Sequence, residues 1–216
     1  MSTALRERWR VVTRTAHAAR AEAIGDDLLR RWSEPHRHYH RTAHLEHCLR
    51  EIDALADAIA VTDRAVLELA AWFHDAIYVA RPDGESEEKS ADLAERALSE
   101  LEVDASVRAR VRAIILATKR HQPTGDPTSD LFLDADLSVL GADPDVFDAY
   151  ERGVRAEWSW VPDATFADGR ATFVRAMLAR PAIFLTERYR ARLEARARKN
   201  LERSLVRLAA PGSTSG

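Results

Sequence analysis

Several residue types that define common protein classes are scarce in this chain. A single cysteine, Cys48, occurs in 216 residues, which excludes an intramolecular disulfide and any zinc site built from several cysteines. Glycine and proline number only 8 each, so the turn residues that a β-sheet protein needs are few. Ala, Leu, Arg and Glu are abundant instead. This composition predicts an all-α fold.

A strong charge imbalance and long apolar runs are also missing. The formal net charge is −3 at pH 7, and the arginines alternate with acids, so we expect no nucleic-acid polymer as a partner. No apolar run approaches the roughly 20 residues of a transmembrane helix. The opening MSTALRERWR lacks the apolar core of a signal peptide. We therefore expect a cytoplasmic protein without a membrane partner, and a homodimer stays possible.

No internal repeat or long linker divides the chain, which predicts one domain over residues 1–210 and a disordered tail at 211–216. The polar segment HQPTGDPTSD at 121–130 is predicted to be a surface loop. Asp63 and Asp143 are predicted N-caps, with Pro144 as a first helical residue. Apolar periodicity predicts helices over Thr3–Ile24, Leu28–Ser33, Thr42–Ala60, Ala65–Val79, Glu87–Glu100, Ala105–Thr118, Leu131–Gly141, Pro144–Trp158, Phe166–Ala179 and Thr186–Leu208.

The dipeptide His74–Asp75 is the first candidate for chemistry. His74 falls on the apolar face of its predicted helix, and Asp75 follows it near the helix end. A buried carboxylate beside a buried imidazole is unfavourable unless the two are paired or bind a metal. The alternative is a solvated Asp at a helix end and a histidine satisfied in the core.

The segment LFLDADLSVLG carries two acids, Asp134 and Asp136, inside an otherwise apolar run. Carboxylates in such a run need partners, and divalent cations that prefer oxygen are suitable ones. The alternative is structural, with Asp134 as an N-cap and Asp136 in the first helical turn. The segment alone does not decide between them.

The stretch RHYHRTAH, residues 37–44, ends on a histidine that opens an amphipathic helix. Cys48 follows His44 by one turn on the shoulder of the apolar stripe, so His44 is predicted to face the core. One histidine, the His–Asp pair and a distant Asp would offer two nitrogens and two oxygens to a divalent ion. Such a shell suits Mn, Fe, Zn, Ni or Co.

With this order of residues, the sequence resembles the HD superfamily of metal-dependent phosphohydrolases, whose signature is H…HD…D on an all-α scaffold. The resemblance implies a single-domain HD-type helical bundle. It also implies His44, His74, Asp75 and Asp136 as ligands of a divalent metal ion, which could be Mn, Ni, Co, Fe, Zn or Mg.

Shorter motifs add to the resemblance. YHRTAH is similar to the YHNxxH element of cyclic-nucleotide phosphodiesterases, with Arg41 in place of their Asn, and ATKRH and DLS are similar to further elements of those enzymes. HRHYH, EEKSA, ATKRH, LFLDADLSVLG, VRAEW, DGR and ARKNL resemble a group of small bacterial predicted HD phosphohydrolases. This second likeness spans Pro35 to Leu201.

The resemblance implies roles for two further side chains and a second role for Asp75. His40 would be the acid that protonates the leaving group, and its alternative is a loop imidazole hydrogen-bonded to backbone. Asp75 would also bridge a second ion or orient water. His121 would bind a phosphate oxygen or a second metal, unless it is simply exposed before its loop.

Cations and acids elsewhere complete the candidate site. Lys119, Arg155 and Arg170 are candidate phosphate contacts, because a transferred phosphoryl group spreads negative charge. Each could equally be a surface residue. Glu87 and Glu88 could orient a ligand or water, or could simply form an acidic first helical turn.

These features predict metal-dependent hydrolysis of a phosphate ester or anhydride in a small molecule, with a nucleotide as the favoured class. The partner would be that small phosphorylated substrate. Two alternatives remain open: an HD-fold di-iron oxygenase, and a non-catalytic ligand-binding HD module.

Overall fold

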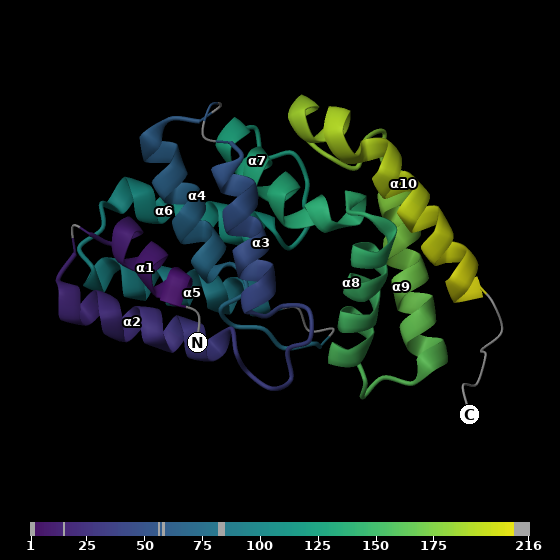
Figure 1. Ribbon diagram of the computed structural model, residues 1–216, viewed down its shortest axis with the longest axis horizontal. Helices are drawn as coiled ribbons and strands as arrows, with labels where there is room; N and C mark the ends of the chain where they lie inside the picture. The colour runs from purple at the N-terminus through teal and green to yellow at the C-terminus, as the bar shows by residue number, and fades with distance from the viewer. Residues whose placement is uncertain (1–2, 15, 56, 58, 82–84, 210–216) are drawn as a thin grey trace. The chain divides into compact units, whose positions relative to one another are not determined.

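The computed structural model describes residues 3–14, 16–55, 57, 59–81 and 85–209. Within these ranges the chain forms helices and connecting turns and contains no strand (Figure 1). The predicted all-α fold is therefore confirmed. Contacts divide the chain into two compact units, Met1–Ala135 and Asp136–Gly216. A single domain over 1–210 stays a prediction, and the expected tail at 211–216 lies outside the described residues.

The first unit is built around one buried helix, α4. Its elements are α1 Thr3–Val12, α2 Ala18–Arg31, α3 Thr42–Asp53, α4 Val61–Phe73, α5 Ser86–Glu100, α6 Ala105–Ala117 and α7 Pro127–Leu137. Every residue over 66–74 is buried, as expected for a helix with neighbours all round it, and α1, α3, α5 and α6 pack against α4. Trp9 meets Trp72 and Phe73 edge-on, with ring centroids 5.2 and 6.0 Å apart.

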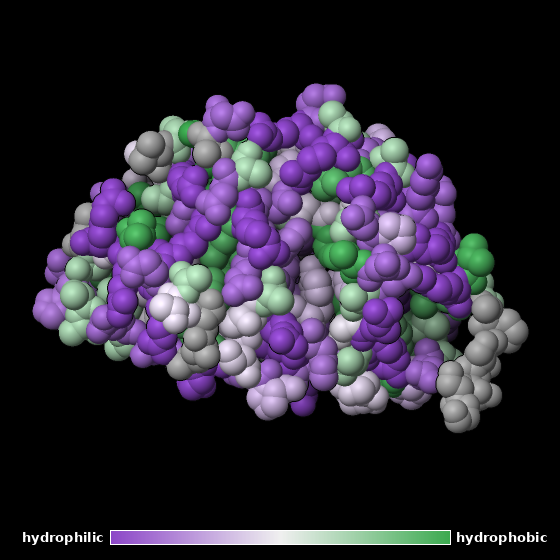
Figure 2. All heavy atoms as spheres, in the orientation of Figure 1, coloured by the Kyte–Doolittle hydropathy of each residue, from purple (hydrophilic) through white to green (hydrophobic). Residues whose placement is uncertain are grey.

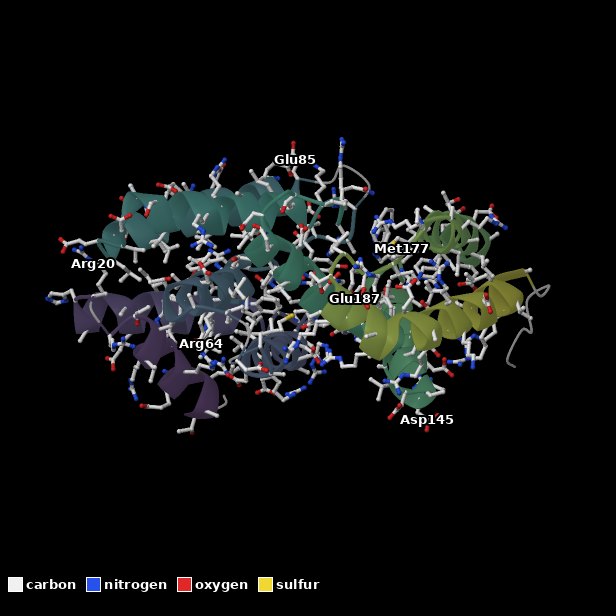
Figure 3. The ribbon with its side chains drawn as sticks, turned by 90° about the horizontal axis from the view of Figure 1, so that it is seen from above. Arg20, Arg64, Glu85, Asp145, Met177 and Glu187 are labelled. Atoms are coloured by element: carbon white, nitrogen blue, oxygen red, sulfur yellow. The ribbon has the colours of Figure 1, made fainter. Side chains whose placement is uncertain are left out.

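The second unit packs its longest helix on a short 3-10 helix. Its elements are η1 Ser138–Gly141, α8 Pro144–Glu157, α9 Asp163–Leu178 and α10 Glu187–Ala209. A Cβ added to Gly141 would lie 2.6 Å from the Cβ of Leu193 on α10. The buried amide of Asn200 donates to the carbonyls of Leu140 and Ala142 at 2.9 Å each. Asp145 marks the first turn of α8 and Glu187 that of α10 (Figure 3).

The single helix expected over Thr3–Ile24 is wrong, because the chain turns back on itself between α1 and α2. The hydroxyl of Thr13 donates to the carbonyl of Trp9 at 2.7 Å, and His17 is extended at ψ 116°. The indole of Trp9 donates to the carbonyl of Ala21 at 2.6 Å, so α1 packs along α2. The short helix expected over Leu28–Ser33 is the end of α2.

Two further helix ends differ from expectation. Helix α3 ends at Asp53 rather than Ala60, where the N–H of Leu55 bonds the carbonyl of Ile52 and tightens the last turn. Helix α4 begins at Val61, so Asp63 lies in its first turn and is not the N-cap.

Helix α4 also ends at Phe73 rather than Val79. Just beyond this end, the carbonyls of Asp75 and Ala76 accept hydrogen bonds from the guanidinium of Arg37.

The loop expected over 121–130 is shorter than predicted, because α7 starts at Pro127. The carboxylate of Asp126 accepts from the N–H of Thr128 and Ser129, and its carbonyl accepts from the N–H of Asp130. These are the contacts of an N-cap residue. The predicted Asp143–Pro144 start of α8 is confirmed, although the Asp143 side chain makes no capping bond.

The remaining helices follow the sequence closely. Helices α5 and α6 match their predicted bounds to within one residue, α9 starts somewhat earlier than expected, and α10 is shifted by one residue. Hydrophilic side chains cover most of the face seen in Figure 2. None of the helices in the described ranges combines the length and apolarity needed to cross a membrane.

Candidate metal centre

Helices α3 and α4 bring two histidines together. His44 lies in the first turn of α3, whose apolar stripe is buried, and His74 caps the C-terminus of α4. Their exposed fractions are 4% and 1%. The two Nε2 atoms lie 3.2 Å apart. The predicted inward orientation of both rings is confirmed.

The imidazole of His74 is held in one orientation. Its Nδ1 lies 3.0 Å from the carbonyl of Ala71, and a carbonyl can only accept, so Nδ1 carries the proton. The lone pair is then on Nε2, which faces His44. The rings of Trp32 and Phe132 flank it, each with its centroid 5.5 Å away. This is how a backbone carbonyl commonly orients a metal-ligating histidine.

Asp75 supplies a carboxylate to the same point. Its Oδ2 lies 3.2 Å from Nε2 of His74 and 3.8 Å from Nε2 of His44. The side chain is 16% exposed, so this edge of the group is accessible to solvent.

Asp136 and Cys48 complete the group. Asp136 lies one turn after Phe132 on α7, the residue whose ring meets His74. One donor atom each from His44, Cys48, His74 and Asp136 lie within 4.8 Å of one another. The Cys48 Sγ is 3.8 Å from Nε2 of His44. Cys48 was predicted only as part of the apolar stripe, although its spacing one turn after His44 already put a thiol on the same side of the helix.

These donors suit a divalent ion. Atoms bonded to one ion at about 2.0–2.3 Å can lie at most about 4.6 Å apart, so the group needs only small side-chain adjustments to close on a metal. Two imidazole nitrogens with carboxylate oxygens and a thiol are ligands for transition metals rather than for Mg²⁺. The group could therefore hold a metal ion.

His40 lies beside this group on the loop before α3. Its half-buried ring stacks on Tyr78 with centroids 4.2 Å apart and meets the ring of His44 edge-on at 5.8 Å. The structure therefore brings it next to the predicted metal ligand His44. Its role as an acid stays a prediction.

The predicted phosphate contacts all have protein partners. Lys119 pairs with Glu88 at 2.6 Å. In the second unit, Arg155 pairs with Asp163 and with two backbone carbonyls. Their roles toward a substrate stay predictions.

Arg170 is the most buried of these cations. It pairs with Glu151 and with the hydroxyl of Tyr150, each at 2.5 Å. Burial raises the pKa of the Tyr150 phenol. His121, the remaining predicted substrate contact, is half-buried and has a positive φ of 46°. For both residues a substrate contact stays a prediction.

Glu87 opens α5 on the side of Asp75. Burial raises the pKa of its carboxyl, and the charge of Asp75 adds to that rise. The Oε2 atoms of Glu87 and Glu88 are buried, with no hydrogen-bond partner among the described residues. Glu87 therefore differs from an ordinary solvated first-turn acid, whereas the side chain of Glu88 is 46% exposed and pairs with Lys119.

The family-model, curated-protein and solved-structure comparisons found no significant match to this chain.

Proposed function

We propose that this chain is a metal-dependent phosphohydrolase of the HD type, acting on a phosphate ester or anhydride of a small molecule, with a nucleotide as the favoured class. One observation carries the proposal. The Nε2 atoms of His44 and His74 and the Oδ2 of Asp75 lie 3.2–3.8 Å from one another. They do so in the chain order of the HD signature, and donor atoms of His44 and His74 lie within 4.8 Å of donor atoms of Cys48 and Asp136.

The donor set determines what a bound ion would do. A divalent ion held here supplies a nucleophilic water near neutral pH and polarises a phosphoryl oxygen. His44 and His74 would hold it from α3 and α4, and Asp136 from α7. Asp75, adjacent to His74 and open to solvent, would orient the attacking water as well as bind.

His40 would be the proton donor. Its ring is close to the group but outside it, with its centroid 5.8 Å from that of the His44 ring. An imidazole that donates a proton to a leaving oxygen typically accelerates such a step by about 10²–10⁴-fold. Among the predicted phosphate contacts, Lys119 is the one closest in sequence to the acids of α5. Its ammonium group would leave Glu88 and bind a phosphate oxygen of the substrate.

The test combines metal analysis with a substrate panel. Protein purified without chelator is analysed for bound metal, then assayed with para-nitrophenyl phosphate and nucleotides under Mn²⁺, Ni²⁺, Co²⁺ and Mg²⁺. We expect hydrolysis, and we expect Asp75→Ala to lose both metal and activity. Asp145→Ala, which removes an exposed acid from α8 (Figure 3), is the matched control and should behave as wild type.

Two results would contradict the proposal. One is an Asp75→Ala variant that keeps full metal content and activity. The other is bound iron whose absorbance changes with oxygen in a protein that hydrolyses nothing on the panel, which is the behaviour of a di-iron oxygenase.

A further inference from the structure

Arg37 is a buried cation next to the candidate metal centre. Its side chain is 0% exposed, and its acidic partner Glu34, at 3.1 Å, is itself 30% exposed. Burying a guanidinium is unfavourable unless its N–H groups find acceptors. The ion pair with the partly exposed Glu34 satisfies only one of these N–H groups. The burial of Arg37 is therefore explained by its other hydrogen bonds.

Those contacts join two segments that are distant in sequence. Arg37 Nη1 donates to the carbonyl of His40 at 3.0 Å and to that of Asp75 at 2.7 Å. Nη2 donates to the carbonyl of Ala76 at 3.1 Å. The carbonyls of Asp75 and Ala76 lie in the turn that follows α4, where no further helical turn supplies N–H donors, and Arg37 donates to both of them. A planar guanidinium fork can reach three carbonyls at once, which an ammonium cannot do in the same geometry.

Aromatic rings hold the guanidinium and His40 together. The Cζ of Arg37 lies 5.5 Å from the ring centroids of both Trp32 and Tyr78. Tyr78 also carries the stacked ring of His40, and Trp32 flanks His74. The same two rings thus contact the cation, the predicted acid and a predicted ligand.

We propose that Arg37 is a positioning residue that ties the loop carrying His40 to the turn carrying His74 and Asp75, and so sets the predicted acid against the predicted ligands. Its catalytic consequence rests on the proposed function. The tie itself is independent of any reaction, because it consists of contacts between backbone segments. A displacement of about 1 Å in a catalytic group can lower a rate by about 10²-fold.

The test uses two variants and a matched control. Arg37→Lys keeps the charge and removes the fork, and Arg37→Ala leaves space for added guanidinium ion. Arg198→Lys is the control, since Arg198 likewise donates to the carbonyls of Leu178, Arg180 and Pro181 and to an acid, but within the second unit. Amide hydrogen exchange is measured on all of them, followed by metal content, kcat and KM.

We expect Arg37→Lys to exchange faster only over residues 36–41 and 75–78, with metal retained. We expect kcat to fall about 10²-fold with KM nearly unchanged, and millimolar guanidinium to restore much of it in Arg37→Ala. Arg198→Lys should change neither segment nor kcat.

The outcomes separate the two proposals. If the wild type hydrolyses nothing, the proposed function fails, and the exchange pattern still decides whether Arg37 ties the two segments. Exchange and kcat as in wild type, or faster exchange spread over the whole first unit, would overturn the positioning role. So would a kcat that guanidinium fails to restore while the fold of Arg37→Ala is intact.

Discussion

At the scale of single residues, Cys48 is the side chain that would most change which ion the candidate centre prefers. Its buried thiol lies 3.8 Å from Nε2 of His44, on the next turn of the same helix. Soft sulfur ligands select Zn²⁺ and similar metals, whereas oxygen ligands favour Mn²⁺ and Mg²⁺. In a centre with both kinds of donor, replacing this one thiol should change which metal binds most tightly.

We therefore predict that Co²⁺-loaded protein shows a thiolate-to-cobalt absorption band that Cys48→Ser lacks. The variant should bind Zn²⁺ about 10-fold or more weakly while keeping its affinity for Mn²⁺, because serine retains an oxygen of similar size. Competition titrations against a chromogenic chelator measure both affinities. Identical cobalt spectra for the two proteins would show that Cys48 is only a core residue.

His40 and His44 are neighbours with different predicted roles. His44→Ala should lose metal. His40→Gln should keep it and lose about 10²–10⁴-fold in kcat. The loss should be largest for alkyl phosphates and smallest for para-nitrophenyl phosphate, whose leaving group needs little protonation. Equal losses on both substrates, with metal retained, would contradict a role for His40 as the acid.

At the scale of elements, the start of α7 depends on Asp126. The hydrogen bond from Ser129, helped by the backbone N–H groups of Ser129 and Thr128, lowers the pKa of this carboxyl against the opposing effect of burial. A carboxyl whose pKa is lower in the folded state stabilises the fold above its unfolded pKa. This contribution is lost as the pH falls through the folded value.

We predict that Asp126→Ala costs about 1 kcal/mol of unfolding free energy at neutral pH, measured by urea denaturation. The difference from wild type should shrink as the pH falls below about 4. Asp126→Asn is the control, because an amide oxygen can still cap the helix without titrating. If the cost of Asp126→Ala were unchanged in acid, the ionised carboxylate would not be the group that caps α7.

Gly141 marks the closest approach of η1 and α10. A methyl group there would lie 2.6 Å from the Cβ and 3.0 Å from the carbonyl oxygen of Leu193, so one backbone must shift. Overpacking of this kind costs about 1–3 kcal/mol, and we predict that loss for Gly141→Ala. Gly169→Ala is the matched control, since nothing lies within 4 Å of its added Cβ and alanine favours a helix. Equal stabilities of the two variants would contradict the packing of α10 on η1.

The sequence predicted those elements whose signals are local. The bounds of α5 and α6 and the Asp143–Pro144 start of α8 follow from periodicity and from helix-start residues. The break between α1 and α2 did not, because it depends on Trp9 packing across the turn onto Ala21. The start of α7 could have been found, since Asp126–Pro127 repeats the signal recognised at Asp143–Pro144.

In the candidate site, too, the sequence indicated some features and not others. The order of His44, His74 and Asp75 was visible in the sequence, and their convergence agrees with it. The contacts of Arg37 were not visible, because its acceptors are backbone carbonyls near the end of another helix. A sequence position does not reveal which carbonyls a fold leaves without partners.

At the scale of the whole molecule, arginine side chains link separate segments within each unit. Arg8 joins α1 to the carboxylates of Asp53 and Glu68 in the first unit. Arg198 holds the segment after α9 in the second. Although the net charge is only −3 at pH 7, many of the charged side chains form specific ion pairs and hydrogen bonds.

The stability of the molecule should depend on metal if the candidate centre binds one. An ion that binds only the folded state adds about 2.7 kcal/mol at 100 times its dissociation constant. For a chain of this size that corresponds to a rise in Tm of about 5–10 °C. We predict this rise on adding Co²⁺ or Zn²⁺ to chelator-treated protein, followed by calorimetry.

Tryptophan fluorescence provides a local readout in the same experiment. The ring of Trp32 lies 5.5 Å from that of His74, so its emission should change on titration with metal before any unfolding occurs. His74→Ala removes the ligand while leaving Trp32 in place, and both responses should disappear in that variant. A rise in Tm that survives His74→Ala would place the ion elsewhere in the molecule. The absence of any rise in the wild type would show that the donors of His44, Cys48, His74 and Asp136 do not form a metal centre.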